Sequence, residues 1–403
     1  MKPQAPPMFA PHLMSINPRP AQVFVRGQGA WLWDAADTPY LDWLQGWAVN
    51  SLGHCPPELT QALHAQASEL ITPSPALHNA PAIELATRLC ELSGFAQAFF
   101  GSTGAEVNEA AIKLARKWGR LHKGGAHEII TLDNAFHGRN LSTMAASGKP
   151  GWDALFAPAM QGFLKARLND MGSVRAALSP RTVAIMLEPV QGEAGVWPAT
   201  HGFLQALRQL CDQEGLLLIF DEVQTGCARL GTLFGFEHFG VTPDIMTLGK
   251  GLGGGVPIAA VLAQARACVF EHGDHGGTYA GNPLMCAAAL AVLSTLSQAT
   301  FLQNVRDMGQ MLRQGLQQVS QRLGLGEVRG HGLLLALELG HDRASEVVRA
   351  CHQLGLLVNA PRPSCLRLMP RLNSTPTEIE QGLERLAAGL TAQRVFNAQS
   401  PAV

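Results

Sequence analysis

Residues 216–221 read Leu-Leu-Leu-Ile-Phe-Asp, a compact run of apolar side chains that ends in an acid. A short apolar run of this kind is typical of a strand that is buried on both faces of a sheet. Helical patterns, for example at residues 202–213, separate several such runs along the chain. This alternation predicts an α/β fold with a mainly parallel sheet that is covered by helices on both sides. The other runs are residues 128–132, 182–187, 244–248 and 258–263.

The two ends of the chain show different patterns. Residues 22–42 alternate apolar and polar side chains around glycines and an Asp-Thr-Pro turn, which indicates a short antiparallel unit. After residue 282 the chain reads as helical at 284–296 and 301–323, strand-like at 332–339, helical near 345–354 and strand-like at 356–359. We therefore expect a large domain at residues 55–285 and a smaller α+β domain at residues 286–403. Residues 1–54 are expected to form an N-terminal part of the smaller domain.

The composition is that of a compact enzyme. The 403 residues are 47% hydrophobic and 15% charged, which excludes intrinsic disorder. The formal net charge of −1 argues against a general polyanion binder, because phosphate backbones need a dense Lys/Arg surface. With only two tyrosines, a surface for stacking nucleic-acid bases is not expected either.

No targeting or metal signal stands out. The proline-rich first 20 residues lack the apolar core of a signal peptide, and the apolar stretches fall short of the roughly 18 residues of a membrane span. The eight cysteines form no Cys-x-x-Cys pair, and His272 and His275 lack a third ligand at a familiar spacing. We expect a cytoplasmic protein with reduced thiols, no membrane partner and no metal.

Polar residues follow three of the predicted strands. In open α/β sheets, ligands bind beyond the carboxyl ends of the strands. Glu188 and Asp221 each follow an apolar run directly, and Lys250 follows another run between two glycines. Taken singly, a strand-end acid is more often a helix cap, and a loop lysine is more often exposed. Together Asp221 and Lys250, 29 positions apart and each after an apolar run, are candidates for one pocket.

The start of a predicted helix completes this set. Thr103 and Glu106 have the spacing of a capping box, and the free N–H groups of such a helix start can bind a phosphate. A phosphate cup, a strand-end acid and a lysine between glycines meet three needs of pyridoxal phosphate. These are to hold the phosphate, to keep the ring nitrogen protonated and to bind the aldehyde.

Six ordered segments resemble the class III aminotransferases. The resemblance runs from about Val23 to Leu390 and is strongest to the acetylornithine/succinylornithine branch. It implies the fold of type I pyridoxal-phosphate-dependent transferases, with a seven-stranded type of sheet. The segments are FFGSTGAEVNE (99–109), NAFHGR (134–139), EPVQGE (188–193), DEVQTG (221–226), LGKGLGGG (248–255) and GTYAGNP (277–283).

The resemblance also implies roles for single positions. Lys250 would carry the cofactor, and Asp221 would pair with its ring nitrogen. Arg139 and Arg367 would bind substrate carboxylates, and Glu193 would pair with Arg367 until the dicarboxylate acceptor arrives. A purely structural ion pair is the alternative for these last two residues. The remaining cofactor contacts would be Thr103, Gly104 and Ala105 at the phosphate, Phe136 and Val223 at the ring faces, Gln224 at the phenolic oxygen, and Thr278 at the phosphate of a neighbouring subunit.

The implied reaction moves the side-chain amino group of N2-acetylornithine to 2-oxoglutarate. It gives N-acetylglutamate 5-semialdehyde and glutamate, as in arginine biosynthesis, in a homodimer with shared sites. The same chemistry on succinylornithine, ornithine, N-succinyl-diaminopimelate or 4-aminobutyrate remains open. An aminomutase would need no second dicarboxylate, so the Glu193 and Arg367 pair argues against it. A silent cofactor-binding dimer would not need the complete set of lysine, acid and phosphate cup.

Three stretches depart from the family pattern. Residues 74–77 read Ser-Pro-Ala-Leu where an aromatic residue is usual, which changes the expected wall of the donor pocket. Residues 228–231 read Ala-Arg-Leu-Gly, a change farther from the chemistry. Arg371 stands where an apolar residue or proline is commoner, and we expect it to face solvent. These departures concern the identity of the donor, and none of them touches Lys250 or Asp221.

Overall fold

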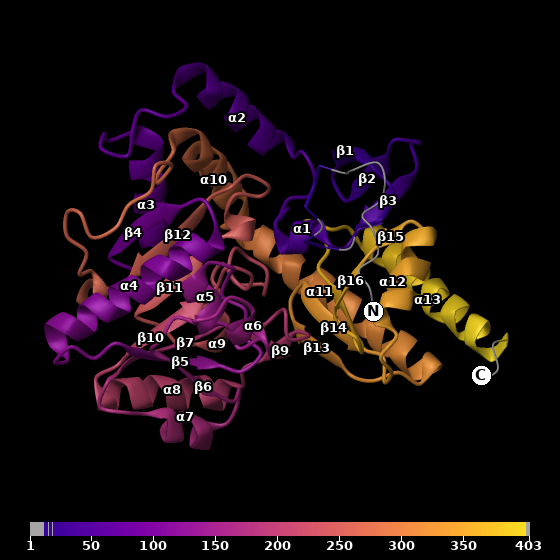
Figure 1. The fold of residues 1–403 in the computed structure, drawn as a ribbon. Coiled ribbons are helices and arrows are strands. Elements are labelled where there is room, and N and C mark those ends of the chain that lie inside the picture. Colours follow the sequence, from indigo (N-terminus) through magenta and orange to yellow (C-terminus); the bar gives the residue numbers. More distant parts are fainter. Residues whose placement is uncertain (1–11, 15, 18, 400–403) are drawn as a thin grey trace.

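Seven strands form the central sheet of the larger part of the molecule (Figure 1). The computed structural model describes residues 12–14, 16–17 and 19–399. The strand order is β4-β12-β11-β10-β7-β5-β6, and only β12 runs antiparallel to its neighbours, which confirms the predicted mainly parallel sheet. The strands are β4 (Gln97–Gly101), β5 (Glu128–Leu132), β6 (Phe163–Ala166), β7 (Thr182–Leu187), β10 (Leu217–Asp221), β11 (Ile245–Leu248) and β12 (Ala259–Ala263).

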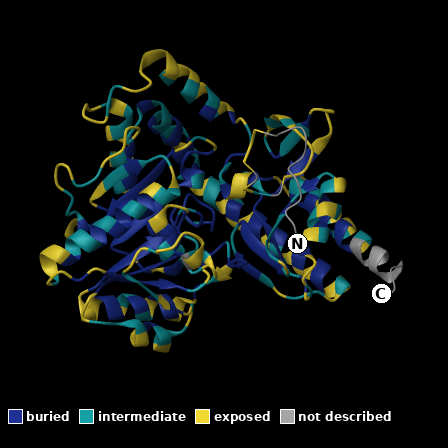
Figure 2. Ribbon diagram, in the orientation of Figure 1, coloured by how far each residue is buried: buried dark blue, intermediate teal, exposed yellow. Residues whose placement is uncertain are grey.

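Both faces of this sheet are buried (Figure 2). Leu217 and Ile219 of β10 pack in the cluster on the side of α4 (Gly104–His122), whereas Leu218 and Phe220 pack in the cluster that includes α8 (His201–Glu214). Alternate side chains of this strand thus pack into hydrophobic clusters on opposite faces of the sheet, as expected for a strand with no polar face. The other helices here are α2 (Pro57–Glu69), α3 (Ala80–Ser93), α5 (Leu141–Ala146), α6 (Trp152–Leu155), α7 (Met171–Ala177), α9 (Gly235–Phe239) and α10 (Pro283–Leu296).

A second, antiparallel sheet forms the centre of the smaller part of the molecule. Its order is β13-β14-β17-β16, and three helices of the C-terminal region accompany it. The N-terminal strands form the predicted antiparallel unit, in which β3 also pairs in parallel with β15, so the two ends of the chain meet. The elements are β1 (Phe24–Gln28), β2 (Trp31–Asp34), β3 (Pro39–Asp42), α11 (Ala299–Leu323), β13 (Val328–His331), β14 (Leu334–Glu338), α12 (Ala344–Gln353), β15 (Leu356–Leu357), β16 (Asn359–Arg362), β17 (Cys365–Leu368) and α13 (Pro376–Gln399).

Some elements differ from the sequence expectation. The single strand predicted at 332–339 is wrong at its start, because Gly332 and Leu333 form the turn of the β13–β14 hairpin. Gly332 has a φ of +52°, and a Cβ there would lie 2.5 Å from the carbonyl oxygen of Arg229, so the turn needs a glycine. The pattern did not predict β4, β6, β17 or α13.

Among the described residues, no single helix is long and apolar enough to cross a membrane. Two consecutive helices, Pro283–Leu296 and Ala299–Leu323, have the length and composition of a membrane span only when they are taken together, and a bend of 71° separates them.

Candidate active site

Asp221 lies at the carboxyl end of the central strand β10 and is buried. Its Oδ2 atom accepts a hydrogen bond from Nδ2 of Asn108 at 2.7 Å and lies 2.8 Å from Nδ1 of His137. Its Oδ1 atom accepts from the backbone N–H of Val223 at 3.0 Å. Three donors from three segments therefore hold the carboxylate in one orientation.

Asn108 acts as the connector of this cluster. Its Nδ2 atom also donates to the backbone carbonyl of His137 at 2.8 Å, and its Oδ1 atom accepts from the hydroxyl of Thr247 at 2.7 Å. Because the amide oxygen is taken by a hydroxyl donor, the amide nitrogen must face Asp221. Asn108 and His137 lie within segments that resemble the family, yet the sequence analysis gave neither of them a role.

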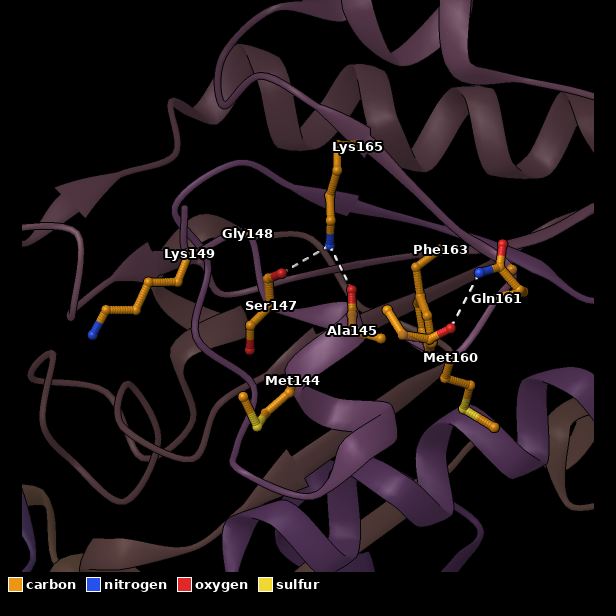
Figure 3. A pocket seen from close by; sticks show the side chains of 11 residues that line it. Met144, Ala145, Ser147, Gly148, Lys149, Met160, Gln161, Phe163 and Lys165 are labelled. Carbon is orange, nitrogen blue, oxygen red and sulfur yellow. Dashed lines mark hydrogen bonds between the residues drawn. The ribbon is translucent and has the colours of Figure 1, made fainter. Parts of the chain in front are cut away.

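A further layer fixes the backbone of His137. Its N–H donates to Oγ of Ser147 at 2.8 Å, and that hydroxyl donates to the carbonyl of Thr143 at 2.7 Å. The ammonium group of Lys165 donates to the carbonyls of Ala145 (2.9 Å) and Ser147 (3.0 Å) at the end of α5 (Figure 3). It also donates to the carbonyl of Ala146 at 2.7 Å. The C-terminus of a helix carries the negative end of the helix dipole and therefore stabilises a nearby cation. Ser147 and Lys165 border a cavity of about 340 Å³.

Lys250 follows β11 and begins a short 3₁₀ turn. Its φ of +41° lies in the left-handed region, which residues other than glycine rarely adopt. Burial lowers the pKa of its ammonium group, against the opposing attraction of Glu193, Asp221 and Glu188. Among the described residues, no hydrogen bond or ion pair to Nζ is found. The amine is thus enclosed, poorly solvated and uncommitted, which suits a nucleophile.

The start of α4 offers two free N–H groups. Thr103 and Glu106 form the predicted capping box, in which Oε2 of Glu106 accepts from the N–H groups of Thr103 (3.1 Å) and Ser102 (2.5 Å). The N–H groups of Gly104 and Ala105 have no acceptor in the described part of the chain. They are therefore available for an anion at the positive end of the helix.

Val223 lies directly against this helix start. A Cβ on Gly104 would lie only 2.7 Å from Cγ1 of Val223, and one on Gly249 would lie 3.2 Å from the same atom. The two glycines thus let the α4 start and the Lys250 loop approach one side chain beside Asp221.

Arg367 and Glu193 form an ion pair near Lys250. Nη1 of the fully buried Arg367 lies 2.6 Å from Oε1 of Glu193 and 3.5 Å from Oε1 of Gln224. Nε of Arg367 donates to Asn359 at 3.2 Å, whereas Nη2 is buried with no partner among the described residues. Burial would raise the pKa of Glu193, but attraction from Arg367 and Lys250 brings it below its usual value.

Glu188 is a buried acid that links two of these segments. Its Oε1 atom accepts from the N–H of Phe136 at 2.8 Å, and its Oε2 atom accepts from the N–H of Gly192 at 3.4 Å. Burial, with repulsion from Asp221, raises the pKa of Glu188 to about 8. Glu188 follows β7 directly, as predicted, but the sequence alone assigns it no role.

Two predicted residues lie apart from this cluster within the chain. Arg139 is exposed, and its guanidinium group lies 5.3 Å from the ring of Trp152, which in turn meets Phe136 edge-on at 5.8 Å. Thr278 is exposed in a loop that is tied to the segment before α3. The ties are Asn79 to the carbonyl of Gly281 (3.0 Å) and Asn282 to Thr72 (2.5 Å).

The expectation for Arg371 is wrong. Its side chain is only 16% exposed and forms an ion pair with Glu378 at 2.8 Å, close to Gly29 and Gly53. Arg371 therefore fastens the start of α13 to the N-terminal segment instead of facing solvent. The partner acid belongs to a helix that the sequence pattern did not predict.

Comparisons with known proteins agree with this geometry. A model of the family "Aminotransferase class-III" matches residues 15–390. Acetylornithine aminotransferase 2 of Bordetella bronchiseptica is 55% identical over 385 residues, which cover 95% of this chain and 97% of that protein.

Solved structures give the same result. N-acetylornithine aminotransferase of Stenotrophomonas maltophilia K279a superposes with a TM-score of 0.83 at 36% identity, covering 94% of this chain and 98% of that one. Ornithine aminotransferase of Toxoplasma gondii reaches a TM-score of 0.92 at 32% identity, covering 96% and 94%. The chain belongs to the class III aminotransferases and is a pyridoxal-phosphate-dependent enzyme with the type I transferase fold.

Proposed function

We propose that this enzyme transfers the side-chain amino group of N2-acetylornithine to 2-oxoglutarate, in the cytoplasm, as a step of arginine biosynthesis. The products are N-acetylglutamate 5-semialdehyde and glutamate. The observation that carries the proposal is the ion pair of the buried Arg367 and the half-buried Glu193 near Lys250. The names of the relatives support the choice of donor.

The residues of the site fit pyridoxal phosphate. The free N–H groups of Gly104 and Ala105, next to Thr103, would bind the phosphate, and Asp221 would hold a proton on the ring nitrogen. Lys250 would bind the aldehyde carbon. Phe136 and Val223 would cover the two faces of the ring, and Gln224 would reach its phenolic oxygen. When bound, this cofactor supplies an electron sink for the negative charge that forms at the substrate carbon.

The side chains of the protein would then move the proton. Lys250 Nζ, whose pKa burial lowers, can act first as the base that takes the proton from the amine-bearing carbon and then as the acid that would donate it at the former aldehyde carbon of the cofactor. Asp221 stays fixed during these transfers because Asn108 and His137 hold it. Fixed charges of this kind need no rearrangement when the charge of the substrate changes.

Arg367 would serve the two substrates in turn. A free buried arginine is costly when no anion is bound, and Glu193 neutralises it while the amine donor is present. The acceptor brings a second carboxylate, which would displace Glu193 and take the two N–H edges of the guanidinium group. Arg139 would bind the α-carboxylate of the donor.

We also propose a homodimer in which each subunit completes the site of its partner. Thr278 and residues 74–77 lie on exposed, mutually tied segments, and Leu77 and Tyr279 there are exposed apolar side chains. Exposed apolar side chains grouped in this way favour burial in an interface. Thr278 would then reach the phosphate in the partner's site.

The proposed domain division follows the sequence expectation, with one shift. The pairing of β3 with β15 supports placing the N-terminal segment in the smaller domain. Because α10 packs against α2 and α3, we place that whole helix in the large domain and begin the smaller one after it.

A donor comparison tests the proposed function. The purified enzyme is supplied with 2-oxoglutarate and, separately, N2-acetylornithine, succinylornithine, ornithine, N-succinyl-diaminopimelate or 4-aminobutyrate, and glutamate is measured. N2-acetylornithine should give the highest kcat/KM. A higher value with any of the other four donors would contradict the proposal while leaving the aminotransferase chemistry in place.

A further inference from the structure

The Glu193 side chain belongs to a short turn that two arginines of the smaller domain contact. The turn, residues 192–196, connects β8 (Val190–Gln191) and β9 (Trp197–Pro198) of the larger part of the molecule. At one end, Glu193 pairs with Arg367 of β17. At the other end, the turn meets Arg329 of β13, in the same sheet as Arg367.

Arg329 contacts the far end of the turn through its Nε atom, and its guanidinium group lies over the ring of Trp197 just after the turn. Its Nε atom donates to the carbonyl of Gly195 at 2.7 Å, and its Cζ atom lies 4.1 Å from the ring of Trp197. Two acids of its own sheet hold it from behind, because Nη2 lies 2.9 Å from Glu338 and Nη1 lies 3.3 Å from Glu327. The side chain is 7% exposed, so these contacts are well shielded from water.

The turn between the two arginines has a strained backbone. Val196 has a φ of +58° and is fully buried, which is an outlier for a β-branched residue and costs conformational energy. Its Cγ1 atom fits against Gly330, next to Arg329, where a Cβ would lie 2.8 Å away. A conformation of this kind persists only where the surroundings enforce it, and the contacts of β13 do so here.

We propose that Arg329 is a positioning residue that anchors the 192–196 turn, with Trp197 as its aromatic platform, in the form in which Glu193 reaches Arg367. The inference rests on the proposed function, since it concerns how that site admits a dicarboxylate. The contact of Arg329 with the turn stays in place, whereas the contact of Arg367 with Glu193 is exchanged for a contact with the substrate. The strength of the fixed contact thereby sets how readily a dicarboxylate replaces Glu193.

The direction of the effect follows from the competition at Arg367. A dicarboxylate binds only the fraction of molecules in which Glu193 has left Arg367, so its apparent affinity scales with that fraction. Loosening the anchor lowers the population of the paired form. It should therefore tighten dicarboxylate binding and weaken binding of the amine donor.

The test uses glutarate, a dicarboxylate without the oxo group, and the cofactor-loaded enzyme. Its dissociation constant is measured by calorimetry, without turnover, for the wild type and for Arg329→Lys, which keeps the charge but loses the planar stack and the Nε donor. Arg313→Lys is the matched control, because Arg313 contacts the carbonyls of Val328 and Gly330 on the same strand but makes no contact with the turn that the structure describes.

We expect Arg329→Lys to lower the glutarate dissociation constant about three- to tenfold, and Arg313→Lys to leave it unchanged. In a Glu193→Gln background the effect of Arg329→Lys should disappear, because no acid is left to compete. The proposal would be overturned if the glutarate dissociation constant of Arg329→Lys equalled that of Arg313→Lys. It would also be overturned if Arg329→Lys changed this constant equally in the wild-type and Glu193→Gln backgrounds.

Trp197→Leu provides a second route if Arg329→Lys does not fold. Trp197 is 44% exposed, so its loss should leave the fold intact and shift the glutarate constant in the same direction by a smaller factor. An unchanged constant in this variant counts against the anchor. Failure of both the wild type and Glu193→Gln to bind glutarate would instead refute the dicarboxylate role of Arg367, and hence the proposed function itself.

Discussion

Oδ2 of Asp221 lies 2.8 Å from Nδ1 of His137, and both side chains are buried at the carboxyl end of the central sheet. Asn108 donates to the same oxygen, so two donors meet on one atom. If an asparagine placed its amide nitrogen at this position, that nitrogen would be a third donor facing the two donors of His137 and Asn108. The orientation and charge of the acid are thus built into the packing around it, ready for a cationic ring nitrogen.

Asp221→Asn tests this arrangement. We expect the rate of amino transfer from the donor to the cofactor to fall about 100- to 10,000-fold, because a neutral side chain cannot stabilise a protonated ring nitrogen. Stopped-flow absorbance gives the rate, and circular dichroism checks that the fold is kept. An unchanged rate in a folded variant would remove Asp221 from the proposed role.

Lys250→Ala should separate catalysis from cofactor binding. Turnover should fall by at least about 10,000-fold, since the only enclosed amine beside Asp221 in the described structure is gone. The N–H groups of Gly104 and Ala105 remain, so the cofactor should still be found with the protein after gel filtration. Activity near the wild-type level in this variant is incompatible with the proposed mechanism.

Glu193→Gln should change the binding of the two substrates in opposite directions. The amide leaves Arg367 without a negative partner, which disfavours the donor and favours a dicarboxylate. Steady-state kinetics should show a KM for N2-acetylornithine that rises several-fold and a KM for 2-oxoglutarate that falls. Equal changes in both KM values would indicate a purely structural ion pair.

The histidines between the larger and smaller parts predict acid sensitivity. Burial lowers the pKa of His331 to about 4, with repulsion from His238, Arg313 and His201 acting in the same direction. The unfolded chain, in which this pKa is near 6.5, therefore binds more protons between about pH 6.5 and pH 4, and stability is lost as the pH falls through that range.

The loss attributable to His331 is at most about 3 kcal/mol. Denaturant unfolding at a series of pH values measures it, and His331→Phe, which can pack against Phe239, should flatten the pH dependence relative to the wild type. Parallel curves for the two proteins would show that His331 does not titrate in this way.

Part of this site could be predicted from the sequence. Asp221 and Lys250 each follow an apolar run, so the rule that parallel strands end at one edge of the sheet was enough to group them. Asn108 could not be found in the same way. It lies on the buried face of α4, 113 positions before Asp221, and only the packing of α4 on the sheet brings the two together.

The errors also have physical reasons. The strand predicted at 332–339 was an apolar run whose glycine needs a positive φ, and a period-2 pattern does not report φ. Arg371 was placed in solvent because its partner Glu378 lies on a helix that the pattern missed. Ion pairs between distant segments depend on tertiary structure, and a single sequence does not show them.

The most direct test of the account is the absorbance of the cofactor-loaded enzyme before and after N2-acetylornithine is added without any 2-oxo acid. The account predicts that the yellow band of the bound cofactor disappears as the amino group is taken up, and that 2-oxoglutarate restores it. A yellow band that persists with N2-acetylornithine would contradict the proposed donor. The absence of any such band after addition of pyridoxal phosphate would contradict the assignment of the site.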